Sequence, residues 1–156
     1  MNTGEIAARL NEFAHTRAEI VALYLYGSYA NGVPRAHSDI DVAVLFSSAV
    51  EDTLDAEVKL GHALAALSGL EKVEVAALNR ATPKLRAEVL QTGQRVYCRD
   101  DEARAAFEFD AMREWWDLQP WYAAYNQEYF AALKERFTDD QRRAYQRARQ
   151  TLATAD

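Results

Sequence analysis

The chain has only one cysteine, Cys98, among its 156 residues. A single thiol cannot form an internal disulfide and is too few for a zinc site built from cysteines. The sequence also lacks an apolar run of membrane-spanning length, and its N-terminus lacks the basic region and apolar segment of a secretory signal. We therefore expect a cytoplasmic protein with no membrane association.

Positive charge is scarce as well. The chain carries 18 lysine and arginine residues against 24 aspartate and glutamate residues, for a formal net charge of −6. Proteins that bind nucleic acid through its phosphates usually carry a positive surface. The composition therefore argues against DNA or RNA as a direct ligand.

Helical and strand patterns alternate along the first hundred residues. We predict helices over residues 3–16, 52–68 and 82–92, and strands over residues 20–26, 39–46, 72–78 and 94–98. A short helical turn is expected over residues 29–32 and a loop over 33–37. Strands that alternate with helices favour an α/β sheet, and no glycine- or serine-rich linker marks a second domain.

Several helix ends carry typical sequence signals. Thr3 is the expected N-cap of the first helix, and Thr82 precedes Pro83, which suits the first position of a helix. Gly93 is expected to end that helix. The helix over residues 52–68 is expected to bury one set of apolar side chains: Leu54, Val58, Leu60, Leu64 and Leu67.

From residue 100 onward the sequence predicts helix, with breaks near Pro120 and at Thr138-Asp139. Residues 107–137 are unusually rich in aromatic side chains. Trp115 and Trp116 are adjacent, so on one helix they point about 100° apart and cannot both face the same small domain. Two interpretations remain: a helical hairpin that buries its own rings on the sheet, or an exposed surface for a protein partner.

The most informative segment begins with Gly27-Ser28 and ends, ten residues later, with Asp39-Ile40-Asp41. Residues two apart in a strand point to the same face, so Asp39 and Asp41 are predicted to project together. Neighbouring carboxylates repel each other unless a cation lies between them. Mg²⁺ binds oxygen ligands, usually one or two carboxylates together with substrate phosphates.

Gly27 and Ser28 follow an apolar strand. Glycine lets the backbone approach a ligand closely, and the free N–H groups after a strand suit phosphate. A phosphate-binding turn beside a carboxylate pair indicates metal-assisted phosphoryl or nucleotidyl transfer.

The Gly-Ser-x10-Asp-x-Asp pattern resembles the signature of the DNA polymerase beta-like nucleotidyltransferases. The segments 27–32 and 38–42 are similar to the minimal nucleotidyltransferase (MNT) group. The resemblance covers about residues 5–99 and, more weakly, the helical tail. It implies an α/β (α+β) fold: a nucleotidyltransferase core over residues 1–99, with a small mixed β-sheet flanked by helices. A C-terminal helical extension over residues 100–156 is expected in the same compact unit.

The resemblance also implies the site residues. Asp39 and Asp41 would bind Mg²⁺, while Gly27 and Ser28 would contact the phosphates of ATP. The segment 71–79 is similar to the family's strand with the third carboxylate, which places Glu74 at that position as a catalytic residue and metal ligand. The alternative for Glu74 is a solvated glutamate on an edge strand.

The chain departs from the family pattern at several positions. The family usually has aspartate where Glu74 stands, and its second aspartate on that strand is replaced by Ala77. Asn31 stands where the family often has arginine, so a cationic phosphate contact is missing there. Arg35 is a candidate to supply this nucleotide contact instead, the alternative being an exposed loop cation.

The MNT resemblance implies a particular function. Small members of the family are antitoxins of type VII toxin–antitoxin systems, which transfer AMP from ATP to a tyrosine of a HEPN-domain ribonuclease toxin. The acidic charge suits docking to a basic partner. Two alternatives remain open: a nucleotidyltransferase for a small molecule such as an aminoglycoside, with the tail completing the acceptor pocket in a homo-oligomer, and a non-catalytic antitoxin that acts by stoichiometric binding.

Overall fold

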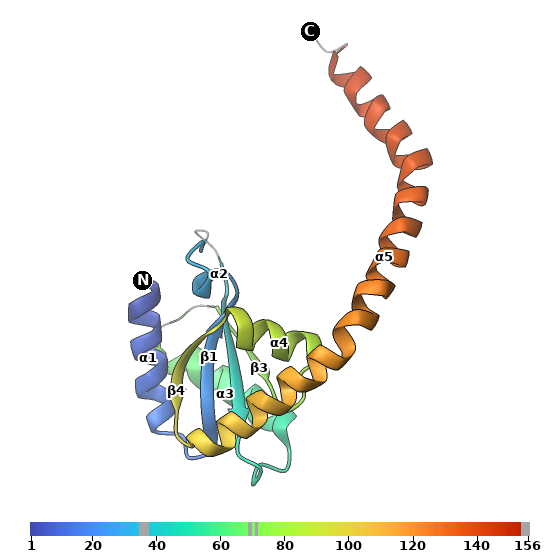
Figure 1. Ribbon diagram of the computed structural model, residues 1–156. Coiled ribbons are helices and arrows are strands. Elements are labelled where there is room, and N and C mark those ends of the chain that lie inside the picture. Colours follow the sequence, from blue (N-terminus) through green and yellow to red (C-terminus); the bar gives the residue numbers. More distant parts are fainter. Residues whose placement is uncertain (35–37, 69, 71, 154–156) are drawn as a thin grey trace. The chain divides into compact units, whose positions relative to one another are not determined.

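The computed structural model describes residues 1–34, 38–68, 70 and 72–153 of the chain (Figure 1). Contacts within the chain divide it into two units, Met1–Trp115 and Trp116–Asp156. The two units are described separately below.

The larger unit is built on a four-stranded mixed sheet in the order β3-β2-β1-β4. The strands are β1 (Ile20–Tyr26), β2 (Ile40–Phe46), β3 (Val73–Ala77) and β4 (Gln94–Cys98). Strand β1 is antiparallel to both β2 and β4, whereas β2 and β3 are parallel. The four predicted strands and the mixed sheet are therefore confirmed.

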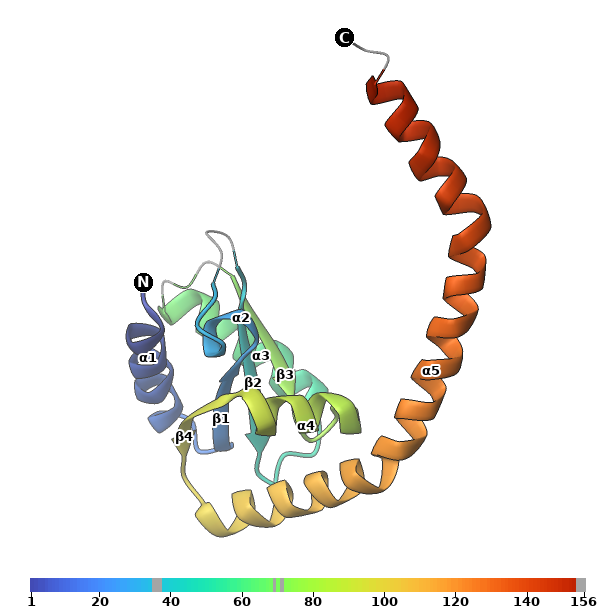
Figure 2. The same ribbon diagram turned by 45° about the horizontal axis from the view of Figure 1, so that its top comes forward.

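Helices cover both faces of this sheet (Figures 1 and 2). The bounds are α1 (Thr3–His15), α2 (Gly27–Ala30), α3 (Thr53–Ser68), α4 (Pro83–Thr92) and α5 (Asp101–Ala153). Helices α1 and α3 share a core with one face of the sheet. Helix α4 and the first turns of α5 share a second core with the other face.

Strand alternation decides which side chains enter each core. Val42 and Val44 of β2 belong to the core beneath α1 and α3, whereas Ala43 and Leu45 belong to the core beneath α4. Because successive strand residues point to opposite faces, Asp41 lies on the α4 side of the sheet.

The helix ends agree with the sequence signals except at α1. Thr82 caps α4 by accepting a hydrogen bond from the N–H of Leu85, with Pro83 as the first helical residue and Gly93 as the C-cap. The predicted N-cap Thr3 is wrong, because Asn2 fills that position and forms a reciprocal capping box with Glu5.

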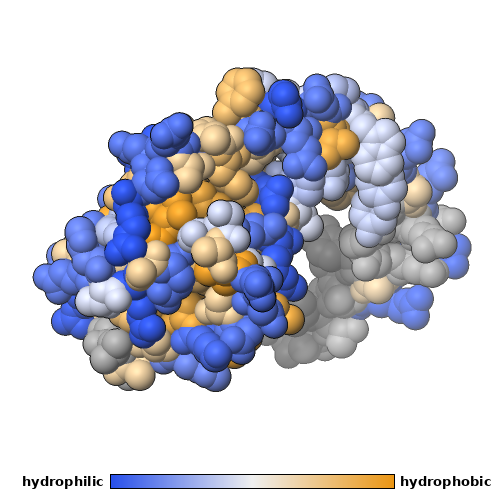
Figure 3. All heavy atoms as spheres, turned by 90° about the horizontal axis from the view of Figure 1, so that it is seen from below, coloured by the Kyte–Doolittle hydropathy of each residue, from blue (hydrophilic) through white to orange (hydrophobic). Residues whose placement is uncertain are grey.

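The buried stripe of α3 differs from the prediction. Leu60 and Leu64 are buried, but Leu54 and Val58 are 50% and 48% exposed; the side chain of Leu67 lies outside the described part of the structure. Ala56 and Ala63 pack against the core in their place. Because a helix presents only one stripe to a sheet, the small alanines set the contact and two larger side chains remain at the surface. A space-filling view from the end of the sheet opposite α2 shows apolar side chains exposed among hydrophilic ones (Figure 3).

The predicted breaks in the C-terminal segment are also wrong. Helix α5 runs without interruption from Asp101 to Ala153, with Pro120 inside it and no end at Thr138-Asp139. A proline removes one helical hydrogen bond and crowds the preceding turn. The helix continues because alanine, glutamate, glutamine and arginine, which favour helix, are frequent in the turns around these positions.

The smaller unit, residues 116–156, carries a ladder of exposed aromatic rings on α5. Trp121 stacks on Tyr125 with ring centroids 5.7 Å apart, and Tyr125 stacks on Tyr129 at 6.2 Å. All three side chains are at least half exposed in the structure. These rings stack along their own helix because residues four apart lie on one helical face.

No helix in the described part of the chain is both long enough and apolar enough to cross a membrane.

The far end of the β2–β3 pair is closed by a side chain. The amide of Asn79 accepts a hydrogen bond from the N–H of Phe46 at 2.9 Å and donates one to the carbonyl of Phe46 at 3.1 Å. Phe46 is buried. Asn79 therefore extends the hydrogen bonding of the sheet by one side chain after β3 has ended.

We predict that Asn79→Ala lowers the free energy of unfolding by about 2 kcal/mol, because it leaves two backbone groups of Phe46 without partners. Differential scanning calorimetry measures the change, with Ser48→Ala in the exposed turn after β2 as the control. An unchanged Tm for Asn79→Ala would show that water replaces the amide without cost.

Candidate active site

The sheet register brings the side chains of Tyr26, Asp41 and Glu74 into one row. Asp41 of β2 lies opposite Tyr26 of β1 on one side and opposite Glu74 of β3 on the other. Directly opposed residues of neighbouring strands point to the same face. Asp41 and Glu74, which the sequence analysis assigned to one site, are therefore side by side on the α4 face.

Asp39 lies immediately outside β2. The strand begins at Ile40, one residue later than predicted, where the N–H of Ile40 donates to the carbonyl of Lys72 at 2.8 Å. The negative charge of Asp39 nevertheless acts on Asp41. Asp39 therefore lies next to the row that contains Asp41 and Glu74, just before β2 begins.

Gly27 faces the carboxylate of Asp41 across the end of the sheet. Its φ of +70° lies in the left-handed region, and a Cβ atom at this position would collide with Oδ2 of Asp41. Any side chain at position 27 is therefore excluded twice, by its backbone conformation and by the carboxylate.

Helix α2 starts at Gly27, and two contacts of Tyr29 attach it to the rest of the larger unit. The hydroxyl of Thr3 donates to the carbonyl of Tyr29 at 3.3 Å, and the Tyr29 side chain packs against the core shared with α1 and α3. Ser28 lies in the first turn of α2 and is partly exposed. The Gly27-Ser28 turn is thus anchored beside Asp41 with Ser28 accessible to a ligand.

The row concentrates negative charge. Burial, followed by the nearby charges of Glu74, Asp39 and Glu88, raises the pKa of Asp41 above its ordinary value. Burial and the charges of Asp41, Glu74, Glu88 and Glu57 raise the pKa of Tyr26. The charge of Glu88 on α4 therefore also acts on these two side chains.

Several acids elsewhere in the larger unit are paired with cations. Glu57 lies 3.7 Å from Arg80, and Glu114 lies 3.6 Å from Arg86. Within the part of the chain that the structure describes, Asp39, Asp41, Glu74 and Glu88 form no such ion pair. Unpaired carboxylates gathered around Asp41, whose pKa is raised, are a place for a cation to bind.

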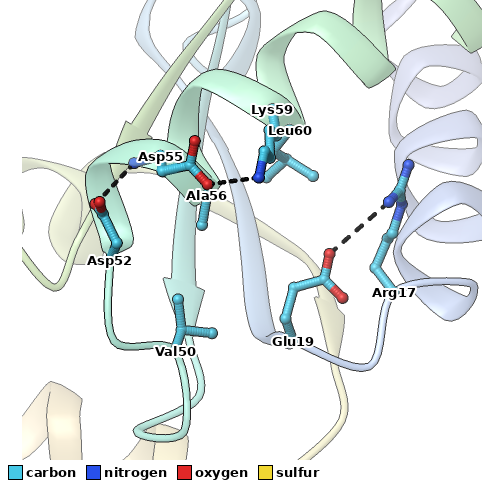
Figure 4. Close-up of a pocket in the computed structure, with 8 residues that line it drawn as sticks. All are labelled: Arg17, Glu19, Val50, Asp52, Asp55, Ala56, Lys59 and Leu60. Carbon is cyan, nitrogen blue, oxygen red and sulfur yellow. Dashed lines mark hydrogen bonds and ion pairs between the residues drawn. The ribbon is translucent and has the colours of Figure 1, made fainter.

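A pocket at the opposite end of the sheet differs from the site because it contains ion pairs (Figure 4). It has a volume of about 350 Å³ and is lined by the segments before β1 and before α3, together with the first turns of α3. Lys59 bonds Asp55 at 2.7 Å, and Arg17 lies 3.9 Å from Glu19. Two acids of that pocket, Glu19 and Asp55, thus each have a cation close by.

The carboxylates suit a metal that is shared with a substrate. Among the described residues, no group of three or more histidine, cysteine, aspartate or glutamate side chains is arranged to hold a metal ion. Mg²⁺ commonly uses only one or two carboxylates and completes its shell with water and substrate phosphates. The oxygen donors of the row fit this ion, and the metal-ligand role of Asp39, Asp41 and Glu74 stays a prediction.

The remaining predicted positions have ordinary surroundings or lie outside the description. Arg35, proposed as a nucleotide contact, lies outside the described residues. Asn31 is exposed, and its N–H donates to the carbonyl of Gly27 at 3.2 Å. Ala77 is buried in the core, and its N–H donates to Oε2 of Glu57 at 2.7 Å.

Two residues of the site were missed by the sequence analysis. Tyr26 was assigned only to a strand, and its position beside Asp41 follows from the pairing register. Glu88 was one polar residue of a predicted helix, and its charge acts on Asp41 because α4 packs over the same sheet face. No pattern in the sequence distinguishes Glu88 from other exposed helical acids.

Comparison with protein families agrees with the site. The family model described as polymerase beta, nucleotidyltransferase matches residues 8–102. This range contains the Gly27-Ser28 turn, the carboxylate row and α4, and it covers more than half of the chain. The chain belongs to this nucleotidyltransferase family.

Solved structures with the same fold are chains of toxin–antitoxin complexes. A toxin–antitoxin structure with AMP-PNP matches at a TM-score of 0.64 and 24% identity, over 83% of this chain and 99% of that chain. A mutant MntA-HpeT complex matches at 0.62 and 25%, over 83% and 98%. A tri-AMPylated Shewanella oneidensis HEPN toxin in complex with MNT antitoxin matches at 0.58 and 23%, over 83% and 96%. No curated protein sequence matches the chain.

The raised pKa of Asp41 predicts how stability depends on pH. Between the ordinary carboxyl value of 3.8 and the raised value, the folded protein binds more protons than the unfolded chain. Its stability therefore falls as the pH rises through this window. In metal-free buffer at pH 7, we expect Asp41→Asn to unfold at a higher temperature than the wild type.

The difference in Tm between Asp41→Asn and the wild type should disappear as the pH falls below 3.8, because the wild-type carboxyl is then protonated. Scanning calorimetry across pH 3–8 measures it, with Glu12→Gln on the exposed side of α1 as the matched acid-to-amide control. A lower Tm for Asp41→Asn at pH 7 would contradict the repulsion.

Proposed function

We propose that the protein is an antitoxin that transfers AMP from ATP to a tyrosine hydroxyl of a HEPN-type toxin. The observation that carries the proposal is the contact of Gly27 with Asp41 at the end of the Asp41–Glu74 row. The family match supports nucleotidyl transfer. The toxin–antitoxin complexes of the same fold, one with AMP-PNP and one with an AMPylated toxin, support the choice of nucleotide and acceptor.

The chemistry follows from the arrangement of the side chains. The Gly27-Ser28 turn binds the triphosphate, because a backbone without Cβ at position 27 allows close approach. The tyrosine oxygen of the acceptor forms a bond to the α-phosphorus while the bond to the pyrophosphate oxygen breaks. The hydroxyl proton passes to a carboxylate of the site.

Asp39, Asp41 and Glu74 are the residues that would hold Mg²⁺. When bound, the ion would neutralise the charge of the triphosphate and polarise the bond to the leaving group. Glu74 would contribute from the neighbouring strand, since its register position is directly opposite Asp41. The mutual repulsion of these carboxylates in the free protein favours binding of a cation.

The two parts of the chain have different roles in this proposal. We assign catalysis to residues 1–99, which hold every proposed site residue, and partner binding to the helical extension over residues 100–156. A reaction that uses ATP and a ribonuclease toxin places the protein in the cytoplasm. A homo-oligomer is compatible with this scheme and is not required by it.

Nucleotide binding should depend on a divalent ion. We expect the affinity for ATP to fall by roughly tenfold or more when Mg²⁺ is replaced by EDTA, because the phosphates and carboxylates then repel each other. Isothermal titration calorimetry measures both conditions, with Glu12→Gln as the control and Asp41→Asn as the test variant. Equal ATP affinity in Mg²⁺ and in EDTA would contradict the proposed metal site.

The identity of the molecule that receives AMP distinguishes the candidate functions. With ATP labelled at the α-phosphate and a HEPN toxin, we expect label on a toxin tyrosine, seen by mass spectrometry as one added adenylyl group. Asp41→Asn should abolish transfer, since it removes a proposed metal ligand, while Glu12→Gln retains it. Label on an aminoglycoside instead would identify a small-molecule enzyme, and neutralisation of the toxin without label would identify a stoichiometric antitoxin.

A further inference from the structure

Two tyrosines of β1 lie on the same face of the sheet. Tyr24 and Tyr26 are two residues apart in the strand, and both contact the core on the α4 face. Tyr24 is buried, and its hydroxyl donates a hydrogen bond to Oε1 of Glu108 on α5 at 2.7 Å. Oε2 of the same glutamate lies 2.6 Å from Arg104. The hydroxyl of Tyr24 therefore holds the start of α5 to the sheet.

The hydroxyl of Tyr26 has no such role in the fold. The ring packs against the core on the α4 face, and the residue is only partly buried. Within the described part of the chain, this hydroxyl forms no hydrogen bond. Every buried polar side-chain atom of the described residues has a partner, so the hydroxyl of Tyr26 is open to solvent. The ring is thus held by the protein while its polar end remains available to a ligand.

Tyr26 lies where the two parts of the candidate site meet. It immediately precedes Gly27, at which the proposed phosphate-binding turn begins. In the antiparallel register of β1 and β2 it is directly opposite Asp41. Directly opposed residues of such strands have Cβ atoms roughly 5 Å apart and point to one face. The side chain of Tyr26 therefore leaves the sheet beside that of Asp41.

The side chains of Tyr26 and Asp41 differ in length. The carboxylate of Asp41 lies against the backbone of Gly27, where a Cβ atom would collide with Oδ2. On ordinary bond lengths a tyrosine hydroxyl lies roughly 6.5 Å from its Cα atom, about twice the distance for an aspartate oxygen. Tyr26 can therefore reach a ligand atom that lies beyond the carboxylate.

A neutral donor suits a position beside carboxylates. A phenol keeps its proton at neutral pH and can donate it to a phosphate oxygen. Unlike lysine or arginine, it forms no ion pair with Asp41 or Glu74, so these carboxylates stay available to a cation. A hydrogen bond to a charged phosphate oxygen is also stronger than one between neutral groups.

We propose that the hydroxyl of Tyr26 donates a hydrogen bond to a phosphate oxygen of the nucleotide at the Gly27-Ser28 turn. This assignment rests on the proposed use of ATP and adds Tyr26 to the residues that bind its phosphates. The hydrogen bond is present both before and during transfer of AMP. Its loss should therefore weaken nucleotide binding and leave kcat nearly unchanged.

The test makes the same substitution at both tyrosines. Tyr26→Phe keeps the ring and should weaken the binding of ATP with Mg²⁺ on the order of tenfold, the effect of one hydrogen bond to a charged group. Isothermal titration calorimetry measures the affinity, and KM for ATP in AMP transfer should rise by a similar factor at an unchanged kcat. Tyr24→Phe is the matched control and should bind ATP like the wild type.

Scanning calorimetry distinguishes a ligand contact from a structural role. Tyr24→Phe should lower the Tm, because it removes the hydrogen bond to Glu108. Tyr26→Phe should keep the wild-type Tm, since its hydroxyl has no partner among the described residues. A fall in Tm for Tyr26→Phe as large as that for Tyr24→Phe overturns the proposal, because the hydroxyl would then stabilise the fold.

Inorganic triphosphate tests which part of the nucleotide Tyr26 contacts. With Mg²⁺ present, it should displace ATP from the wild type, and Tyr26→Phe should weaken its binding by the same factor as that of ATP. A loss confined to ATP overturns the proposal, because the hydroxyl would then contact the base or the ribose. A wild type from which inorganic triphosphate displaces no ATP also overturns it.

The variants also separate this proposal from the proposed function. Equal ATP affinity in Tyr26→Phe and Tyr24→Phe overturns the role of Tyr26 alone, provided that the wild type still transfers AMP. A wild type that binds no ATP in the presence of Mg²⁺ overturns both proposals.

Discussion

The contact between a bare backbone and a carboxylate organises this protein. Gly27 has no Cβ, so Oδ2 of Asp41 can lie against the turn that follows β1. The antiparallel register of β1 and β2 then fixes Tyr26 beside Asp41, and the parallel register of β2 and β3 fixes Glu74 on the other side. The missing Cβ atom of Gly27 thus allows the turn after β1 to meet Asp41 and the side chains beside it.

The grouping of acids at the site is electrostatically unfavourable, whereas the rest of the larger unit contains ion pairs and apolar cores that stabilise the fold. Several acids outside the site are paired with arginine or lysine, as Glu57 is with Arg80, and apolar cores form on both faces of the sheet. At the site, burial and the charges of neighbouring acids instead raise the pKa of Asp41. Local conflict of this kind is expected where function, rather than folding, selects the residues.

Local signals in the sequence were sufficient for the strands and the caps of α4. They also singled out Gly27 and Asp41, which the structure brings together. Alternating apolar residues and glycine or proline punctuation act over a few residues, so they can be recognised directly. The continuity of α5 through Pro120 could not be predicted, because it depends on the cooperativity of a 53-residue helix. Tyr26 and Glu88 could not be assigned either, since strand register and helix placement bring together residues far apart in the chain.

Helix α5 also determines what tryptophan fluorescence can report about this protein. All three tryptophans of the chain, Trp115, Trp116 and Trp121, lie on α5. The last two are 60% and 63% exposed, so their indoles are already surrounded by water in the folded state. Emission from these two indoles will therefore change little when the sheet unfolds, but it will shift to shorter wavelength whenever another surface removes water from their rings.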